Sequence, residues 1–159
     1  MSTVRPATDS ASTDPTTDAL DRVGFTAAVE GLRRGRGPGS VQILAVDVVG
    51  LDEINRAHGW SAGDAVLRAI ASHLGELAPG GVVGRIAADE LAVAFIGDDD
   101  VARFLAQEVE RPVTVRHGDR DIVVSVTTGV AADDPQTAPL EGIDRADLRR
   151  SAIHHRAPN

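Results

Sequence analysis

Residues 41–49 read VQILAVDVV, and this stretch decides the fold. The run is apolar almost throughout and rich in Val, a pattern typical of a strand that is buried on both faces of a sheet. Asp47 interrupts it, and a carboxylate in a buried strand is costly unless it has a partner. The sequence therefore predicts a central strand, covered on both sides, that carries one candidate functional acid.

The segments after this strand alternate between helix and strand patterns. A short helix is predicted at 51–58 with Gly59 as its stop, and a longer helix follows, opened by a capping box over residues 61–64. Turn and stop residues predict the later elements: strands at 82–86 and 91–96, a helix that carries Val101, Phe104, Leu105 and Val109 before Pro112, strands at 113–116 and 121–130, a loop at 131–141, and a helix at 144–155.

The N-terminal segment differs in composition from the rest of the chain. Residues 1–13 have almost nothing to bury, so they are predicted to be a disordered tail. A helical pattern begins at Thr17 and ends in the Gly-rich stretch 35–39. With 159 residues, 42% of them hydrophobic, residues 14–159 have room for one core and are expected to form a single domain. The order of elements indicates an α/β or α+β fold, with a central mixed, largely antiparallel sheet of about five strands flanked by helices.

Composition excludes several classes of function. A net charge of −8 repels phosphate backbones, and an aromatic content of 3% disfavours base-stacking readers of single strands, so no nucleic-acid partner is expected. Cysteine is absent, which excludes thiol catalysis and Cys-ligated metal. No apolar run approaches the roughly 20 residues that span a bilayer, and the N-terminus lacks an apolar signal core. We therefore expect a soluble, cytoplasmic protein with no membrane partner.

Five motifs occur in order along the chain. They are DPTT at 14–17 with Asp21, Arg22 and Phe25; DVVGLDEINRAHGWSAGD at 47–64; RIAADEL at 85–91; TGVA at 128–131; and Ala146-Asp147. In this order they resemble the patterns DxLTGLxNRxxF, DxDxFKxxNDxxGHxxGD, RxGGDEF, SxGxA and AD. Those patterns belong to the GGDEF domain, the diguanylate cyclase family of bacterial signalling.

The resemblance implies a nucleotidyl cyclase-like fold, related to adenylyl cyclases and polymerase palms, and a chemistry. Two GTP-loaded subunits face each other and condense their nucleotides into cyclic diguanylate, with Mg²⁺ or Mn²⁺ to activate a hydroxyl and neutralise phosphate charge. By this resemblance Asp47 and Asp89 would hold metal, and Glu90 would be a metal ligand or the catalytic base. Asn55 and Asp64 match the residues that read the guanine edge. The implied partners are a guanine nucleotide and either a second copy of the chain or a regulatory protein.

Each of these residues also has an ordinary structural interpretation. Asp64 is the acid of the predicted capping box, Asn55 could be a polar helix residue, and Asp89 and Glu90 could be turn residues. Asp47 is the hardest to explain structurally, because it lies in a buried strand.

Several positions depart from the family pattern. Ala87 and Ala88 replace the glycine pair, which predicts a strained turn or a crowded ligand, and Leu91 replaces the final Phe. Asp52 replaces a phosphate-binding lysine and reverses its charge, so triphosphate affinity should be poor. His154 and Pro158 fall near the C-terminal lysine and arginine of the family, whereas Ala78 and Gly81 stand where a product-inhibition motif RxxD would lie.

These departures predict a degenerate GGDEF-domain protein of cyclic diguanylate signalling. We expect it to be catalytically inactive and to act as a nucleotide-binding or protein-interaction regulatory module. The alternative hypothesis is a weakly active diguanylate cyclase, or an enzyme that turns over a related nucleotide, since the family's acidic and base-reading residues are present: Asp47, Asp89, Glu90, Asn55 and Asp64. A third is a protein-interaction subunit with no nucleotide role.

Overall fold

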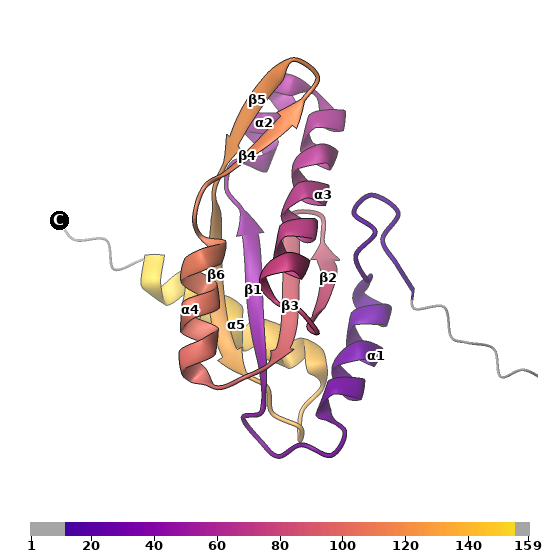
Figure 1. Cartoon of the computed structure of the whole chain (residues 1–159), viewed down its shortest axis with the longest axis vertical. Coiled ribbons are helices and arrows are strands. Elements are labelled where there is room, and N and C mark those ends of the chain that lie inside the picture. The colour runs from indigo at the N-terminus through magenta and orange to yellow at the C-terminus, as the bar shows by residue number, and fades with distance from the viewer. Residues whose placement is uncertain (1–11, 155–159) are drawn as a thin grey trace, which may run out of the picture.

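A four-stranded sheet forms the centre of the molecule in the computed structural model, which describes residues 12–154 and the side chains of residues 12–147 (Figure 1). Its strand order is β2-β3-β1-β6, with every neighbouring pair antiparallel. A separate two-stranded sheet pairs β4 with β5. The strands are β1 (Val41–Val48), β2 (Val82–Ala87), β3 (Glu90–Ile96), β4 (Val113–His117), β5 (Arg120–Val124) and β6 (Val126–Ala132). The helices are α1 (Arg22–Arg33), α2 (Leu51–His58), α3 (Trp60–Leu77), α4 (Asp99–Val109) and α5 (Pro139–His154).

Helices cover both faces of the sheet (Figure 1). Side chains alternate between the two faces of a strand. In β1, Leu44 and Val46 therefore pack with α3 and α4, whereas Ile43 and Ala45 pack with α1 and α5. This arrangement confirms the predicted strand buried on both faces, and it explains why β1 reads as a continuous apolar run.

The sheet differs from the prediction in two ways. It has four strands, all antiparallel to their neighbours, where a mixed, largely antiparallel sheet of about five strands was expected; the isolated bridge of Leu20 to Gly84 at its edge is parallel. The predicted strand at 121–130 is broken at Ser125, so that β5 pairs with β4 while β6 pairs with β1. The carbonyl of Ser125 accepts a hydrogen bond from Val49 N at 2.9 Å, at the point where the chain passes from one sheet to the other. Alternating polarity continues through this point, so the local pattern could not show the change of partner.

The first and last helices, α1 and α5, begin at residues other than those predicted from apolar spacing. Helix α1 begins at Arg22, not Thr17, because Asp21 caps it by accepting a hydrogen bond from Gly24 N at 2.8 Å. The preceding residues form a turn in which Asp18 has a φ of 62°. Helix α5 begins at Pro139, five residues before the predicted start, in keeping with the tolerance of helix first turns for proline.

The predicted capping box at 61–64 is wrong. Helix α3 begins at Trp60 with Gly59 as its N-cap, and no side chain caps it. The hydroxyl of Ser61 instead lies 3.2 Å from His117 Nε2 on β4. Gly59 has a φ of 90°, a conformation that glycine adopts without strain, and it lets α3 follow α2 directly.

Part of the predicted disordered tail belongs to the fold. Residues 1–11 lie outside the described residues, but Thr13 pairs with Leu20, and the carbonyl of Ser12 accepts a hydrogen bond from Asp21 N at 3.0 Å. Leu20 also bridges to Gly84 on β2. The segment before α1 thus extends the contacts of the sheet edge. None of the helices in the described part of the chain is long and apolar enough to cross a membrane.

Candidate functional site

Two carboxylates lie opposite each other at one end of the central sheet. Asp47, near the end of β1, is the register partner of Glu90, the first residue of β3. Directly opposed residues of an antiparallel pair project from the same face with Cβ atoms about 4.5–5.5 Å apart. Both residues are half-buried. The strand pairing therefore brings together two of the acids that the sequence singled out.

Asp89 lies beside this pair but is exposed in the turn between β2 and β3. Its carbonyl accepts a long hydrogen bond from Val48 N at 3.4 Å. No group of three or more His, Cys, Asp or Glu side chains is arranged to hold a metal among the residues that the structure describes, so Asp47, Asp89 and Glu90 do not form such a group. Two carboxylates still fit Mg²⁺, which is commonly bound by one or two carboxylates together with water and substrate phosphates.

The turn at Ala87 and Ala88 is made without the strain that the sequence predicted. Asp18 is the only non-glycine residue with a positive φ among those described, so neither alanine adopts the left-handed conformation. The register shifts between Arg85 and Ala87, which leaves Ile86 as an extra residue in β2. A bulge of this kind increases the local twist, and the added twist helps the two-residue turn to close with ordinary backbone angles. The predicted backbone strain is therefore wrong; whether the methyl groups crowd a ligand stays a prediction.

Arg85 holds this turn against the N-terminal segment. Its Nη2 donates to the carbonyl of Ala88 at 2.7 Å, and its Nη1 lies 3.3 Å from both carboxylate oxygens of Asp14. Burial alone would raise the pKa of Asp14, but hydrogen bonds from the side chain and backbone of Thr17, together with Arg85, outweigh it and lower the pKa. Sequence reasoning matched Asp14 and Arg85 to family motifs but did not predict their contact, because 71 residues separate them.

Asn55 and Gly63 form a tight crevice between α2 and α3. A Cβ atom on Gly63 would lie 1.8 Å from Asn55 Oδ1, so only glycine leaves room for this side chain. Asn55 Oδ1 is buried and has no hydrogen-bond partner within the described residues. A buried polar atom without a partner is costly, and such atoms are a reason to look for a ligand. Asp64 follows Gly63 on α3 and is exposed.

A hollow of about 290 Å³ opens beside this crevice. It is lined by Asp52, Asn55, Arg56 and Trp60. Asp52 is exposed, so its carboxylate faces solvent at the position where the family pattern has lysine. The β4–β5 hairpin lies at the same end of the molecule as α2 (Figure 1). The hollow thus offers an amide, one carboxylate, one guanidinium and an indole ring to a small polar ligand.

A family model described as diguanylate cyclase, GGDEF domain, matches residues 11–156. The chain belongs to the GGDEF family. No curated protein matches this GGDEF domain. The match covers the carboxylate pair, the turn and the crevice alike.

Solved GGDEF structures share the fold. The diguanylate cyclase SiaD of Pseudomonas aeruginosa, solved in complex with its activator SiaC, superposes with a TM-score of 0.79 at 22% identity over 91% of this chain. The chain spans only 59% of SiaD. The GGDEF domain of DgcB from Caulobacter crescentus, solved in complex with cyclic diguanylate, has a TM-score of 0.72 and 25% identity and covers 98% of this chain and 92% of its own. The FimX GGDEF domain of Pseudomonas aeruginosa has a TM-score of 0.72 and 21% identity, over 93% of this chain and 96% of its own.

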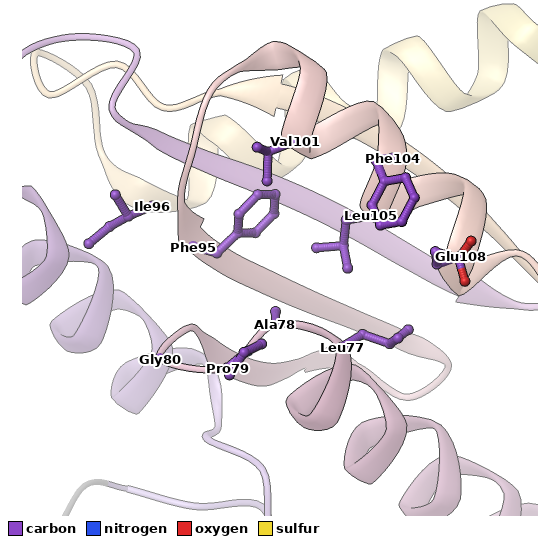
Figure 2. A pocket seen from close by; sticks show the side chains of 10 residues that line it. All are labelled: Leu77, Ala78, Pro79, Gly80, Phe95, Ile96, Val101, Phe104, Leu105 and Glu108. Atoms are coloured by element: carbon purple, nitrogen blue, oxygen red, sulfur yellow. The ribbon is translucent and has the colours of Figure 1, made fainter.

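A second hollow of the GGDEF domain lies where β3 ends. Figure 2 shows the side chains that line it, from α4, the end of β3, the end of α3 and the residues that follow α3. The hollow has a volume of about 400 Å³. Ala78, at the first position of the absent RxxD motif, lines it, and Glu108 is the one charged residue in its lining. Phe104 is 64% exposed at its edge, whereas the adjacent Leu105 is buried. An apolar lining of this kind offers nothing to pair with the phosphates of a nucleotide.

Proposed function

We propose that this GGDEF domain is a guanine-nucleotide-binding regulatory module of cyclic diguanylate signalling that does not catalyse the cyclase reaction and acts in the bacterial cytoplasm. The observation that carries the proposal is the lining of the α2–α3 hollow. The hollow is lined by Asn55, a candidate reader of the guanine edge, and by Asp52, which stands where the family pattern has the lysine that a triphosphate needs.

The base-reading half of the site fits guanine. An ionised carboxylate only accepts hydrogen bonds, so Asp64 suits the N–H groups of guanine better than the unprotonated ring nitrogen of adenine. The amide of Asn55 can both donate and accept, and its Oδ1 has no partner among the described residues. Guanine would supply a donor to that atom.

The part of the site that would face the phosphates should bind them weakly. Asp52 is exposed near the site, and Asp89 is exposed in the adjacent turn, so a triphosphate would meet carboxylates rather than lysine. Mg²⁺ held by Asp47 and Glu90 would offset part of this repulsion when bound. The cation would neutralise phosphate charge, but it would not replace the missing positive side chain.

A product assay tests the loss of catalysis. Concentrated protein is incubated with GTP and Mg²⁺ or Mn²⁺, and the products are separated by chromatography and identified by mass. We expect no cyclic diguanylate, while calorimetry detects guanine-nucleotide binding that Asn55→Ala and Asp64→Ala abolish. Cyclic diguanylate that disappears in Glu90→Ala would overturn the proposal.

Formation of cyclic diguanylate that depends on Glu90 would support the alternative, a weakly active diguanylate cyclase. The register pairing of Asp47 with Glu90 favours it, because the two acids stand together as a metal-dependent transfer requires. If neither product nor nucleotide binding is found, the domain is better explained as a protein-interaction subunit. The SiaD structure, solved with its activator SiaC, is a precedent for a protein partner.

A further inference from the structure

Trp60 occupies an unusual place for a large aromatic residue. It is the only tryptophan of the chain and the first residue of α3, and 77% of its surface is exposed. It also lines the 290 Å³ hollow together with Asn55. A flat apolar ring at the edge of a hollow whose wall carries hydrogen-bonding groups is an arrangement suited to a heteroaromatic ligand.

The polar atoms of the hollow point to the same class of ligand. Asn55 Oδ1 is buried without a partner among the described residues, and Gly63 leaves the space that this side chain occupies. Aromatic side chains stack on nucleobases irrespective of the phosphates that the base carries. Asp52 and Arg56, of opposite charge, line the hollow together and so offer no net positive charge to a phosphate chain.

We infer that Trp60 is a specificity-determining residue that stacks on the guanine ring, so that the site binds the nucleoside part of its ligand and gains nothing from a triphosphate. This inference rests on the proposed function and adds the class of ligand: guanosine and its monophosphate bind at least as tightly as GTP when no divalent cation is present.

Intrinsic fluorescence tests the stacking directly, because every tryptophan photon comes from Trp60. Guanosine, GMP and GTP are titrated separately without divalent cation, with free N-acetyltryptophanamide as the control for light absorption by the base. We expect saturable quenching by guanosine, with a Kd no higher than that for GTP. A lower Kd for GTP than for guanosine would overturn the inference.

Variants at two exposed aromatic residues provide the matched control. Calorimetry with guanosine should give a Kd about 5- to 150-fold higher for Trp60→Ala and close to wild type for Trp60→Phe, because stacking needs an aromatic ring. Phe104→Ala, at the other hollow, should leave the Kd unchanged. Trp60 is exposed, so its variants should fold, which an unchanged Tm would verify.

The two proposals fail in different ways. If calorimetry detects guanosine binding that Trp60→Ala does not weaken, and fluorescence does not change, then Trp60 does not stack on the base and the inference is wrong while the proposed function stands. If wild-type protein binds neither guanosine nor GTP in calorimetry, both the inference and nucleotide binding are wrong.

Discussion

At the scale of single residues, one charge and one missing side chain distinguish the crevice between α2 and α3. Asp52 reverses the charge expected at its position, and Gly63 lacks the Cβ that would collide with Asn55. Ala87 and Ala88, the most conspicuous departures in the sequence, matter less to the backbone than expected, since neither has a positive φ. We therefore expect substitution of Asp52 to change ligand binding more than substitution of Ala87 or Ala88.

Asp52→Lys should restore affinity for phosphates. The substitution replaces an acid with a base near the bound ligand, and we expect the Kd for GTP to fall about 10-fold while the Kd for guanosine stays the same. Calorimetry with both ligands, at low salt and without divalent cation, measures the difference. An equal improvement for guanosine would show that the effect does not act through phosphate.

Gly63→Ala should separate binding from stability. The new Cβ displaces Asn55, whose side-chain end can move, so the free energy of unfolding changes little while guanosine binding weakens. Gly75→Ala, in the same helix with nothing within 4 Å of its added Cβ, should raise stability by about 0.5–1 kcal/mol and leave binding unchanged. Urea unfolding and calorimetry on both variants check this, and weaker binding in Gly75→Ala would contradict it.

At the scale of secondary-structure elements, ion pairs between distant segments hold α1 and the N-terminal segment in place. Arg33, at the end of α1, donates from Nε to Asp133 at 2.6 Å and from Nη2 to its other oxygen at 2.9 Å. The side chain of Asp133 is 1% exposed. The hydrogen bonds that Arg33 donates to Asp133 raise the pKa of Arg33, although burial acts in the opposite direction.

Arg33→Met should be strongly destabilising, by about 3–5 kcal/mol, because it leaves the carboxylate of Asp133 buried without its counter-ion. Arg34→Met provides the control, since Arg34 is the exposed neighbour and its loss should change stability by less than about 0.5 kcal/mol. Chemical denaturation measures both. Similar values for the two variants would mean that the pair contributes no more than a surface charge.

The contact of Asp14 with Arg85 should make stability depend on pH in the acid range. The pKa of Asp14 is lower in the folded protein than its ordinary value of 3.8, so its contribution to stability is fully present above that value and is lost as pH falls through the lowered pKa. Asp21, whose pKa is lowered chiefly by the backbone hydrogen bond from Gly24, acts in the same direction. Urea unfolding between about pH 6 and pH 3 should show a shallower loss for Asp14→Asn than for wild type.

At the scale of the whole molecule, the helices on both faces of the sheet and the negative net charge affect how a ligand can approach the candidate site. Helices α1 and α5 cover one face of the sheet and α3 and α4 the other, so neither face is open to a ligand. Asp47, Glu90 and α2 lie at one end, and the apolar hollow of Figure 2 lies at the other. The net charge of −8 adds a repulsive field for any polyanion that approaches.

This repulsive field predicts that GTP binds more tightly as the salt concentration rises, the opposite of what an attractive phosphate site would show. Raising the ionic strength from about 0.05 M to 0.3 M shortens the screening length to below about 10 Å, so repulsion of GTP weakens and its Kd without divalent cation should fall. Uncharged guanosine should show no change over the same range. Fluorescence titration at several salt concentrations measures both, and a Kd for GTP that rises with salt would reveal an attractive phosphate site.

The sequence by itself determined the elements whose signals are local: the apolar run of β1, the glycine stop after α2, the 3.6-residue spacing of α3 and the acidic cap of α4. It also determined the family, because five motifs stand in one order. The sequence also led us to expect Asp47 near Glu90, but only the tertiary structure decided the register that sets them directly opposite. It alone decided the break at Ser125, the unstrained alanine turn and the pairing of Arg33 with Asp133. These features join residues far apart in the chain. Propensity and spacing report on neighbours in sequence, whereas register, counter-ions and changes of sheet depend on which segments pack together.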